Sequence, residues 1–145
     1  MPERETMERA KEDAREGKSP STQAGEFVKE EMDHIREGKH GARSTKQAIA
    51  IGLSKARRAG VKLPARGSAA TRKKAAQDMR AAKNPHKVSA KRSRATEDAL
   101  KREGHSAASR ASLSRQAKTT AAARGKRARS QAAKKAAATR SRRAA

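Results

Sequence analysis

Residues 21–64 read STQAGEFVKEEMDHIREGKHGARSTKQAIAIGLSKARRAGVKLP, and this stretch decides the fold. The chain has 145 residues but only 11 Leu, Ile, Val and Phe residues. Eight of these 11 lie in this stretch: Phe27, Val28, Ile35, Ile49, Ile51, Leu53, Val61 and Leu63. Because burial of such side chains drives folding, we expect the chain to pack against itself mainly here.

The first half of the stretch predicts a helix from about Thr22 to Glu37. Ser21 or Thr22 is expected to cap its first amides. Gly38 stands where a helix commonly ends in a left-handed residue. The apolar residues recur at helical spacing and define one packing stripe, made of Ala24, Phe27, Val28, Met32 and Ile35.

The second half predicts a helix from about Thr45 to Ala59, ended by Gly60 and Pro64. Ser44 and Gln47 have the spacing of a capping box. The packing face is Ile49, Gly52, Leu53 and Ala56, where Gly52 would let the partner helix approach closely. The two helices form an antiparallel or angled hairpin. A hairpin this small needs outside help, from a homodimer through the hairpin or from docking of the N-terminal helix.

Residues 1–20 are interpreted as a charged N-terminal helix and linker. Acidic and basic residues alternate over 3–16, and the only apolar stripe is Met7, Ala10 and Ala14. A solvated helix that frays is the main expectation. The alternative is that the Met7 stripe docks onto the central pair of helices.

Residues 65–145 are interpreted as a basic tail rich in Ala, Lys and Arg, with low order. Four stretches (68–83, 93–103, 106–124 and 126–143) have high helix propensity. Each holds at most one large apolar residue, so nascent helices are expected. The fold class predicted is therefore all-α: a small N-terminal helical hairpin over residues 21–64, followed by a largely disordered or nascent-helical basic tail.

Net charge points to a polyanionic partner. The chain carries +23 with a pI near 11.5, while residues 1–37 alone are net acidic. Phe27 is the only aromatic residue, so no stacking platform for single strands is predicted. We expect duplex DNA to be bound through its phosphates without sequence readout. Structured RNA is an alternative target. A regulatory adaptor is an alternative function, in which residues 1–37, the acidic head, control the basic tail.

The candidate DNA contacts lie on the second hairpin helix and along the tail. A helix-turn-helix domain could read bases through Gln47 and Arg58, but such domains have a third helix and a larger core, which the sequence does not predict. Phosphate contact is therefore favoured, and the residues assigned to it are Arg43, Lys46, Lys55, Arg57, Arg58, Arg72, Lys73, Lys74, Lys91, Arg92, Arg94, Lys126, Arg127, Arg129, Lys134, Lys135, Arg140, Arg142 and Arg143.

Other function classes find little support in the sequence. The four histidines, at 34, 40, 86 and 105, lack cysteine companions and zinc-site spacing, so no metal and no cofactor is expected. No nucleophile elbow or phosphate loop occurs, so no catalytic residue is assigned and the protein is not expected to be an enzyme. No run of 18 apolar residues predicts a membrane helix. Residues 1–17 lack the apolar core of a secretory signal.

Residues 39–64, together with STQAGEFVKEE upstream, resemble a family of short basic bacterial proteins sometimes labelled plasmid stabilisation proteins. Residues 89–118 resemble the downstream part of the same proteins. The resemblance implies no catalytic residues. The tail is also similar in composition to the basic arms of linker histones and histone-like bacterial proteins. A nucleoid-associated or architectural protein of the bacterial cytoplasm is the resulting expectation.

Overall fold

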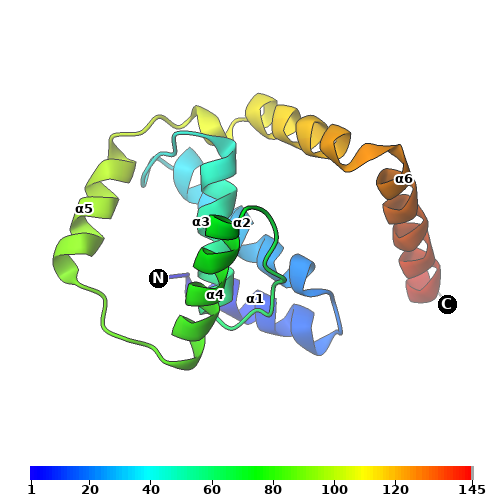
Figure 1. The fold of residues 1–145 in the computed structure, drawn as a ribbon, viewed down its shortest axis with the longest axis horizontal. Helices are drawn as coiled ribbons and strands as arrows, with labels where there is room; N and C mark the ends of the chain where they lie inside the picture. Colours follow the sequence, from blue (N-terminus) through cyan, green and yellow to red (C-terminus); the bar gives the residue numbers. More distant parts are fainter. Residues whose placement is uncertain (145) are drawn as a thin grey trace. The chain divides into compact units, whose positions relative to one another are not determined.

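The computed structural model describes residues 1–144, and within that range the secondary structure is helical, without strands. The chain divides into two compact units, one from Met1 to Ser109 and one that begins at Arg110. The elements are α1 (Arg4–Arg15), α2 (Pro20–Arg36), α3 (Thr45–Arg58), α4 (Ala69–Lys83), α5 (Ala90–Lys101), the 3-10 turn η1 (Ser106–Ala108) and α6 (Arg110–Ala144), shown in Figure 1.

Helices α2 and α3 form the predicted hairpin, and their ends follow local rules. The N-cap of α2 is Ser19, whose Oγ accepts from the Thr22 N–H at 3.3 Å. The prediction of a cap at Ser21 or Thr22 is wrong, because Pro20 is suited to the first helical position and starts the helix earlier. The predicted cap of α3 is confirmed: Ser44 Oγ accepts from the Gln47 N–H at 3.2 Å.

The hairpin is tight because α3 carries a glycine where it crosses α2. A Cβ built on Gly52 would lie 2.7 Å from the Cα of Val28, closer than real Cβ atoms come to backbone. The predicted role of Gly52 as the point of close approach is thus confirmed. Phe27 and Ile35 of α2 and Ala56 of α3 are almost fully buried.

Helix α1 docks on this hairpin. Ala10 is buried in one cluster with Phe27 and Val61, and Met7 packs against that cluster. The expectation of a solvated, fraying helix is therefore wrong, and the alternative of docking through the Met7 stripe is confirmed. Docking of α1 supplies part of the burial that an isolated hairpin would lack.

Helix α4 packs on α3, the second helix of the hairpin. It buries two of its own side chains, Ala75 and Asp78. Ser54 Oγ and Arg58 Nε of α3 donate to the Asp78 carboxylate at 2.7 and 2.9 Å. With α1 and α4 added, four helices pack together. The premise that the hairpin has no third helix is therefore wrong.

The chain returns to the hairpin after α5, through backbone contacts. The Gly41 N–H donates to the Leu100 carbonyl at 2.9 Å, and the Ala42 N–H donates to the Gly104 carbonyl at 3.1 Å. Thr45 Oγ1 then donates to the Ala107 carbonyl in η1 at 2.7 Å. These bonds make residues 100–108 part of the first unit.

The prediction of a largely disordered or nascent-helical tail after Pro64 is wrong, because α4, α5, η1 and α6 occupy most of residues 69–144. The reason is that alanine builds much of the interior. Among the described residues, eight of the 13 buried hydrophobic side chains are alanines, including Ala75, Ala107 and Ala108 beyond Pro64. A count of large apolar residues therefore underestimates what this chain can pack.

Helix α6 has a different basis, since none of its described residues is buried. Its alanines and long basic side chains have high intrinsic helix propensity, which adds up over 35 residues. Gly125, with φ of 74°, interrupts the helical conformation, as the sequence predicts. No helix between residues 1 and 144 is long and apolar enough to cross a membrane.

Candidate functional site

The 19 predicted phosphate contacts are spread over both units. All of them are exposed except Lys55 and Arg57, which are partly buried. Eleven lie in the first unit and eight, from Lys126 onward, lie in α6. The structure does not gather them into one pocket, and their surroundings differ.

Three of the predicted contacts already neutralise buried acids of the first unit. Lys55 Nζ lies 2.7 Å from Glu31 Oε2. Arg58 Nε and Lys74 Nζ lie 2.9 and 3.2 Å from Asp78 Oδ1. A cation paired in this way releases fewer counterions on binding phosphate, so these three side chains are weaker candidates than exposed, unpaired ones.

The Asp78 carboxyl shows how firmly these pairs are held. Burial alone would raise its pKa, but hydrogen bonds from Ser54, Arg58 and Lys74 outweigh burial and hold the pKa below its ordinary value. The carboxylate therefore stays charged at neutral pH and fixes α4 to α3.

The two side chains considered for base readout are also engaged. Gln47 Oε1 accepts from the Arg43 N–H at 2.7 Å, and Arg58 binds Asp78. Reading a base edge would require both to give up these partners. This arrangement favours phosphate contact over direct readout on α3.

The cations of α6 are different, because the sequence contains no acid after Glu103. Within residues 110–144 no Lys or Arg takes part in an ion pair. At about 100° of rotation per residue, the cations from Lys126 onward point in all directions around the helix. This segment offers the densest set of unpaired positive charges among the described residues.

A second cluster, which sequence reasoning missed, joins α2, α3 and the loop between them. Glu31 is fully buried, and its carboxylate lies between Lys55 Nζ at 2.7 Å and His40 Nε2 at 3.3 Å. Glu30 is also buried, and its Oε1 lies 3.9 Å from both Lys55 Nζ and His34 Nε2. Two adjacent buried carboxylates thus share a single lysine and face two histidines.

A signal for this cluster exists in the sequence. Glu31 lies four residues after Phe27 and four before Ile35, so it belongs to the buried stripe of α2 rather than to its solvated face. A carboxylate in that position must find a cation or a proton. The partners themselves, Lys55 and His40, become neighbours only when α3 and the loop fold back.

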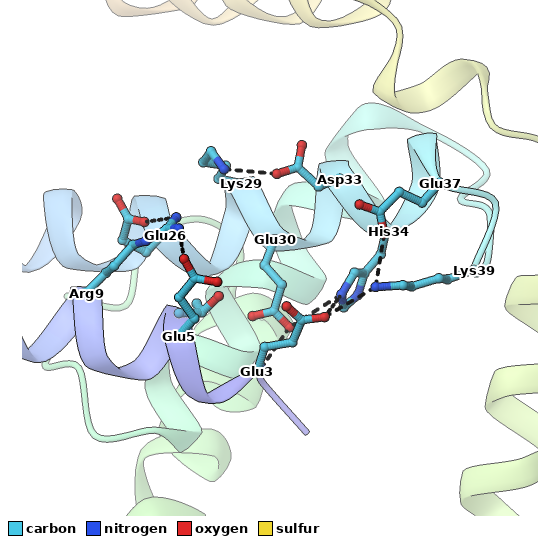
Figure 2. Close-up of a pocket in the computed structure, with 11 residues that line it drawn as sticks. Glu3, Glu5, Arg9, Glu26, Lys29, Glu30, Asp33, His34, Glu37 and Lys39 are labelled. Carbon is cyan, nitrogen blue, oxygen red and sulfur yellow. Dashed lines mark hydrogen bonds and ion pairs between the residues drawn. The ribbon is translucent and has the colours of Figure 1, made fainter.

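A shallow acidic groove of about 120 Å³ opens beside His34, between α1 and α2. Figure 2 shows Glu3, Glu30, His34 and Lys39 converging at one end of it. Glu3 Oε1 lies 2.9 Å from His34 Nε2 and accepts from Lys39 Nζ at 3.3 Å. Hydrogen bonds from His34 first, and then Lys39, lower the pKa of Glu3 below its ordinary value.

Comparison with known proteins identifies relatives for the hairpin only. The model of a family of unknown function (DUF6496) matches residues 20–67, about a third of the chain, which covers α2 and α3. No curated protein and no solved structure shows a significant match. The resemblance to proteins labelled plasmid stabilisation proteins stays a prediction. Over its helical hairpin, the chain is similar to a family of unknown function.

Proposed function

We propose that this protein binds duplex DNA without sequence specificity, as a nucleoid-associated or architectural protein. The observation that carries the proposal is α6. This helix presents 12 Lys and Arg residues and no acid, and it buries none of its described side chains. A helix without a packing role and with charge of one sign is suited to a polyanion.

Counterion release supplies the free energy. Each phosphate neutralised by Lys or Arg frees condensed cations from the DNA, whatever the base sequence. The helical segment after Gly125 is about 28 Å long at 1.5 Å per residue, so it can lie along several base pairs. Cations on all of its sides allow contact in many rotational settings, which suits non-specific binding.

The first unit contributes a smaller set of contacts in this proposal. Arg43 and Lys46 are exposed at the start of α3. Lys55, Arg58 and Lys74 are held by Glu31 and Asp78 instead. In this proposal the first unit is a folded domain, and α6 is a basic arm that makes most of the DNA contacts.

A salt titration with matched variants tests the proposal. For a duplex of about two helical turns, log affinity should fall linearly with log salt between about 50 and 200 mM. Arg127→Gln with Arg129→Gln should lower the magnitude of the slope by about 1.8, since each lost contact removes about 0.9. Lys11→Gln with Arg15→Gln removes the same charge from α1 and should leave the slope nearly unchanged.

Two further results would overturn the proposal. One is a slope that changes equally in both double variants, which would mean that net charge alone matters. The other is an affinity that changes more than about tenfold when the DNA sequence is scrambled, because phosphate contacts carry no sequence information. Competition with structured RNA distinguishes the two nucleic acids.

A second candidate is a regulatory adaptor, in which the acidic head limits access of DNA to the basic arm. The acidic groove between α1 and α2 favours it. Changing Glu5, Glu8, Glu12 and Glu16 to Gln should then raise DNA affinity, and the gain should shrink as salt rises. Unchanged affinity at low salt would remove this candidate and leave the first one standing.

A further inference from the structure

Three side chains of types that bind metals converge at the C-terminal end of α2. Glu31 and His34 lie one turn apart on α2, and His40 comes from the following loop. One ligand atom from each lies within 4.8 Å of the others. Two imidazoles and one carboxylate form a common donor set for divalent transition metals.

The ring of His40 is oriented in the way that metal-binding histidines are. Its Nδ1 lies 3.0 Å from the Gly41 carbonyl oxygen, which can only accept a hydrogen bond. Nδ1 therefore donates to this carbonyl, and Nε2 is the ring nitrogen that faces the cluster. That Nε2 faces Glu31 Oε1 at 3.3 Å. Histidines that bind metals commonly donate their other ring N–H to a backbone carbonyl in the same way.

The cluster also has more negative charge than its own cations balance. Glu30 Oε2 and both oxygens of Glu31 are buried and have no hydrogen-bond partner of good geometry. The exposed fractions of these two side chains are 3% and 1%. Lys55 is the single close cation for both carboxylates. A buried anion of this kind needs a further cation beside it.

Solvent reaches the edge of the site at its two histidines. The side chains of His34 and His40 are 14% and 15% exposed, and His34 lines the groove. Glu3, half exposed, holds His34 Nε2 at 2.9 Å through its Oε1, and this contact would have to give way for Nε2 to bind a metal. The acids that line the groove would attract a cation toward His34.

We propose that Glu31, His34 and His40 bind one divalent transition-metal ion, with Zn²⁺ as the reference metal. Imidazole nitrogens favour Zn²⁺, Co²⁺ and Ni²⁺ over Mg²⁺ and Ca²⁺, which prefer oxygen-only sites. His40 Nε2 and Glu31 Oε1, 3.3 Å apart, already have a spacing that suits ligands about 2.0–2.2 Å from one metal, and His34 would complete the set. The ion would tie the loop after α2 to the helix itself. This inference is independent of the proposed DNA binding.

Isothermal titration of the full chain, without any histidine tag, with Zn²⁺ tests the proposal. One Zn²⁺ per chain should bind, and Mg²⁺ should not. His34→Gln and His40→Gln should each weaken Zn²⁺ binding by about 100-fold or more, because loss of even an outer-shell partner costs about 10- to 100-fold. His86→Gln, which changes an exposed histidine outside the cluster, is the matched control and should bind as the parent does.

Co²⁺ provides a second readout, since its visible absorption reports coordination by nitrogen ligands. The Co²⁺ spectrum should be retained in His86→Gln and lost in His34→Gln. Circular dichroism without metal shows which variants fold. If His40→Gln does not fold, His34→Gln still tests the site, because the His34 side chain is partly exposed. Equal Zn²⁺ affinity in His34→Gln and His86→Gln, or no Zn²⁺ binding by the parent at micromolar concentration, would overturn the proposal.

Discussion

At the scale of single residues, the interior of the first unit depends on one lysine. Lys55 lies against Glu31, whose side chain is 1% exposed, and it is also the nearest cation to Glu30. Removing one partner of a buried pair is strongly destabilising, since the other charge remains without compensation. Sequence reasoning assigned Lys55 to DNA, but the structure gives it an internal role as well.

We therefore expect Lys55→Met to destabilise the fold by about 3 kcal/mol. Lys46→Met, on the exposed side of the same helix, should change stability by no more than about 0.5 kcal/mol. Urea unfolding in a chelating buffer measures both variants. Equal effects would mean that the Lys55–Glu31 pair does not hold the interior.

A second residue-scale prediction concerns glycine within helices. Gly52→Ala should destabilise by about 1–3 kcal/mol, because its methyl group would meet the backbone of Val28. Gly25→Ala is the control: it lies within α2 with nothing in reach of a Cβ, so it should stabilise by about 0.5–1 kcal/mol. Thermal melts compare the two, and the same sign for both would contradict the close crossing.

Residue-level signals were predicted where they are local. Ser44 as a cap, Gly38 and Gly60 as helix ends, and Gly52 as the crossing point all follow from neighbours within a few positions. The carboxylate–histidine cluster could not be derived this way. His40 and Lys55 meet Glu31 only after α3 folds against α2, and that distance is not encoded in their spacing.

At the scale of elements, α4 shows how a helix with few large side chains can still dock. It buries Ala75 and anchors Asp78 to two residues of α3. The sequence predicts only a nascent helix here, because the stretch has one large apolar side chain and the packing of alanine leaves no clear pattern. The charge pair across the helices was equally invisible, since Arg58 and Asp78 are 20 residues apart.

The Asp78 anchor predicts a specific dependence of stability on pH. Its pKa is lowered in the folded state, so its contribution is present above the ordinary value near 4 and lost as pH falls through the folded value. Asp78→Asn should cost about 2 kcal/mol at neutral pH. The difference from the parent should begin to shrink as pH falls below about 4 and vanish once pH is below the lowered pKa of the folded state.

Chemical unfolding at several pH values measures this difference. Asp98→Asn, on the exposed surface of α5, is the control and should show little effect at any pH. A difference between parent and Asp78→Asn that persists at low pH would mean that the charge of Asp78 is not what anchors α4 to α3.

At the scale of the whole molecule, the two units are stabilised in different ways. The first has a buried core that Leu53 packs against, while α6 buries none of its described residues and relies on helix propensity. All-helical secondary structure followed from composition and pattern. The extent of the first unit, to Ser109, did not, because it depends on backbone contacts made after α5.

Aspartate substitutions in the two units should distinguish these two sources of stability. Leu53→Asp places a charge against the core and should cost about 3 kcal/mol or more. Leu113→Asp in α6 should change the main thermal transition little. Circular dichroism of the full chain records both, and equal losses would mean that α6 has a buried core.

The backbone contacts between the loop at Gly41 and the end of α5 have one more consequence. Peptide groups hold residues 100–108 to the hairpin, whereas residues 84–89, between α4 and α5, are exposed. Covalent continuity through that linker is therefore not what keeps the two sides together. A single cut within residues 84–89, made at a specific protease site introduced there, should leave both fragments associated, co-eluting as one species on gel filtration. The covalent link between α4 and α5 is therefore not needed to hold the first unit together once it has folded.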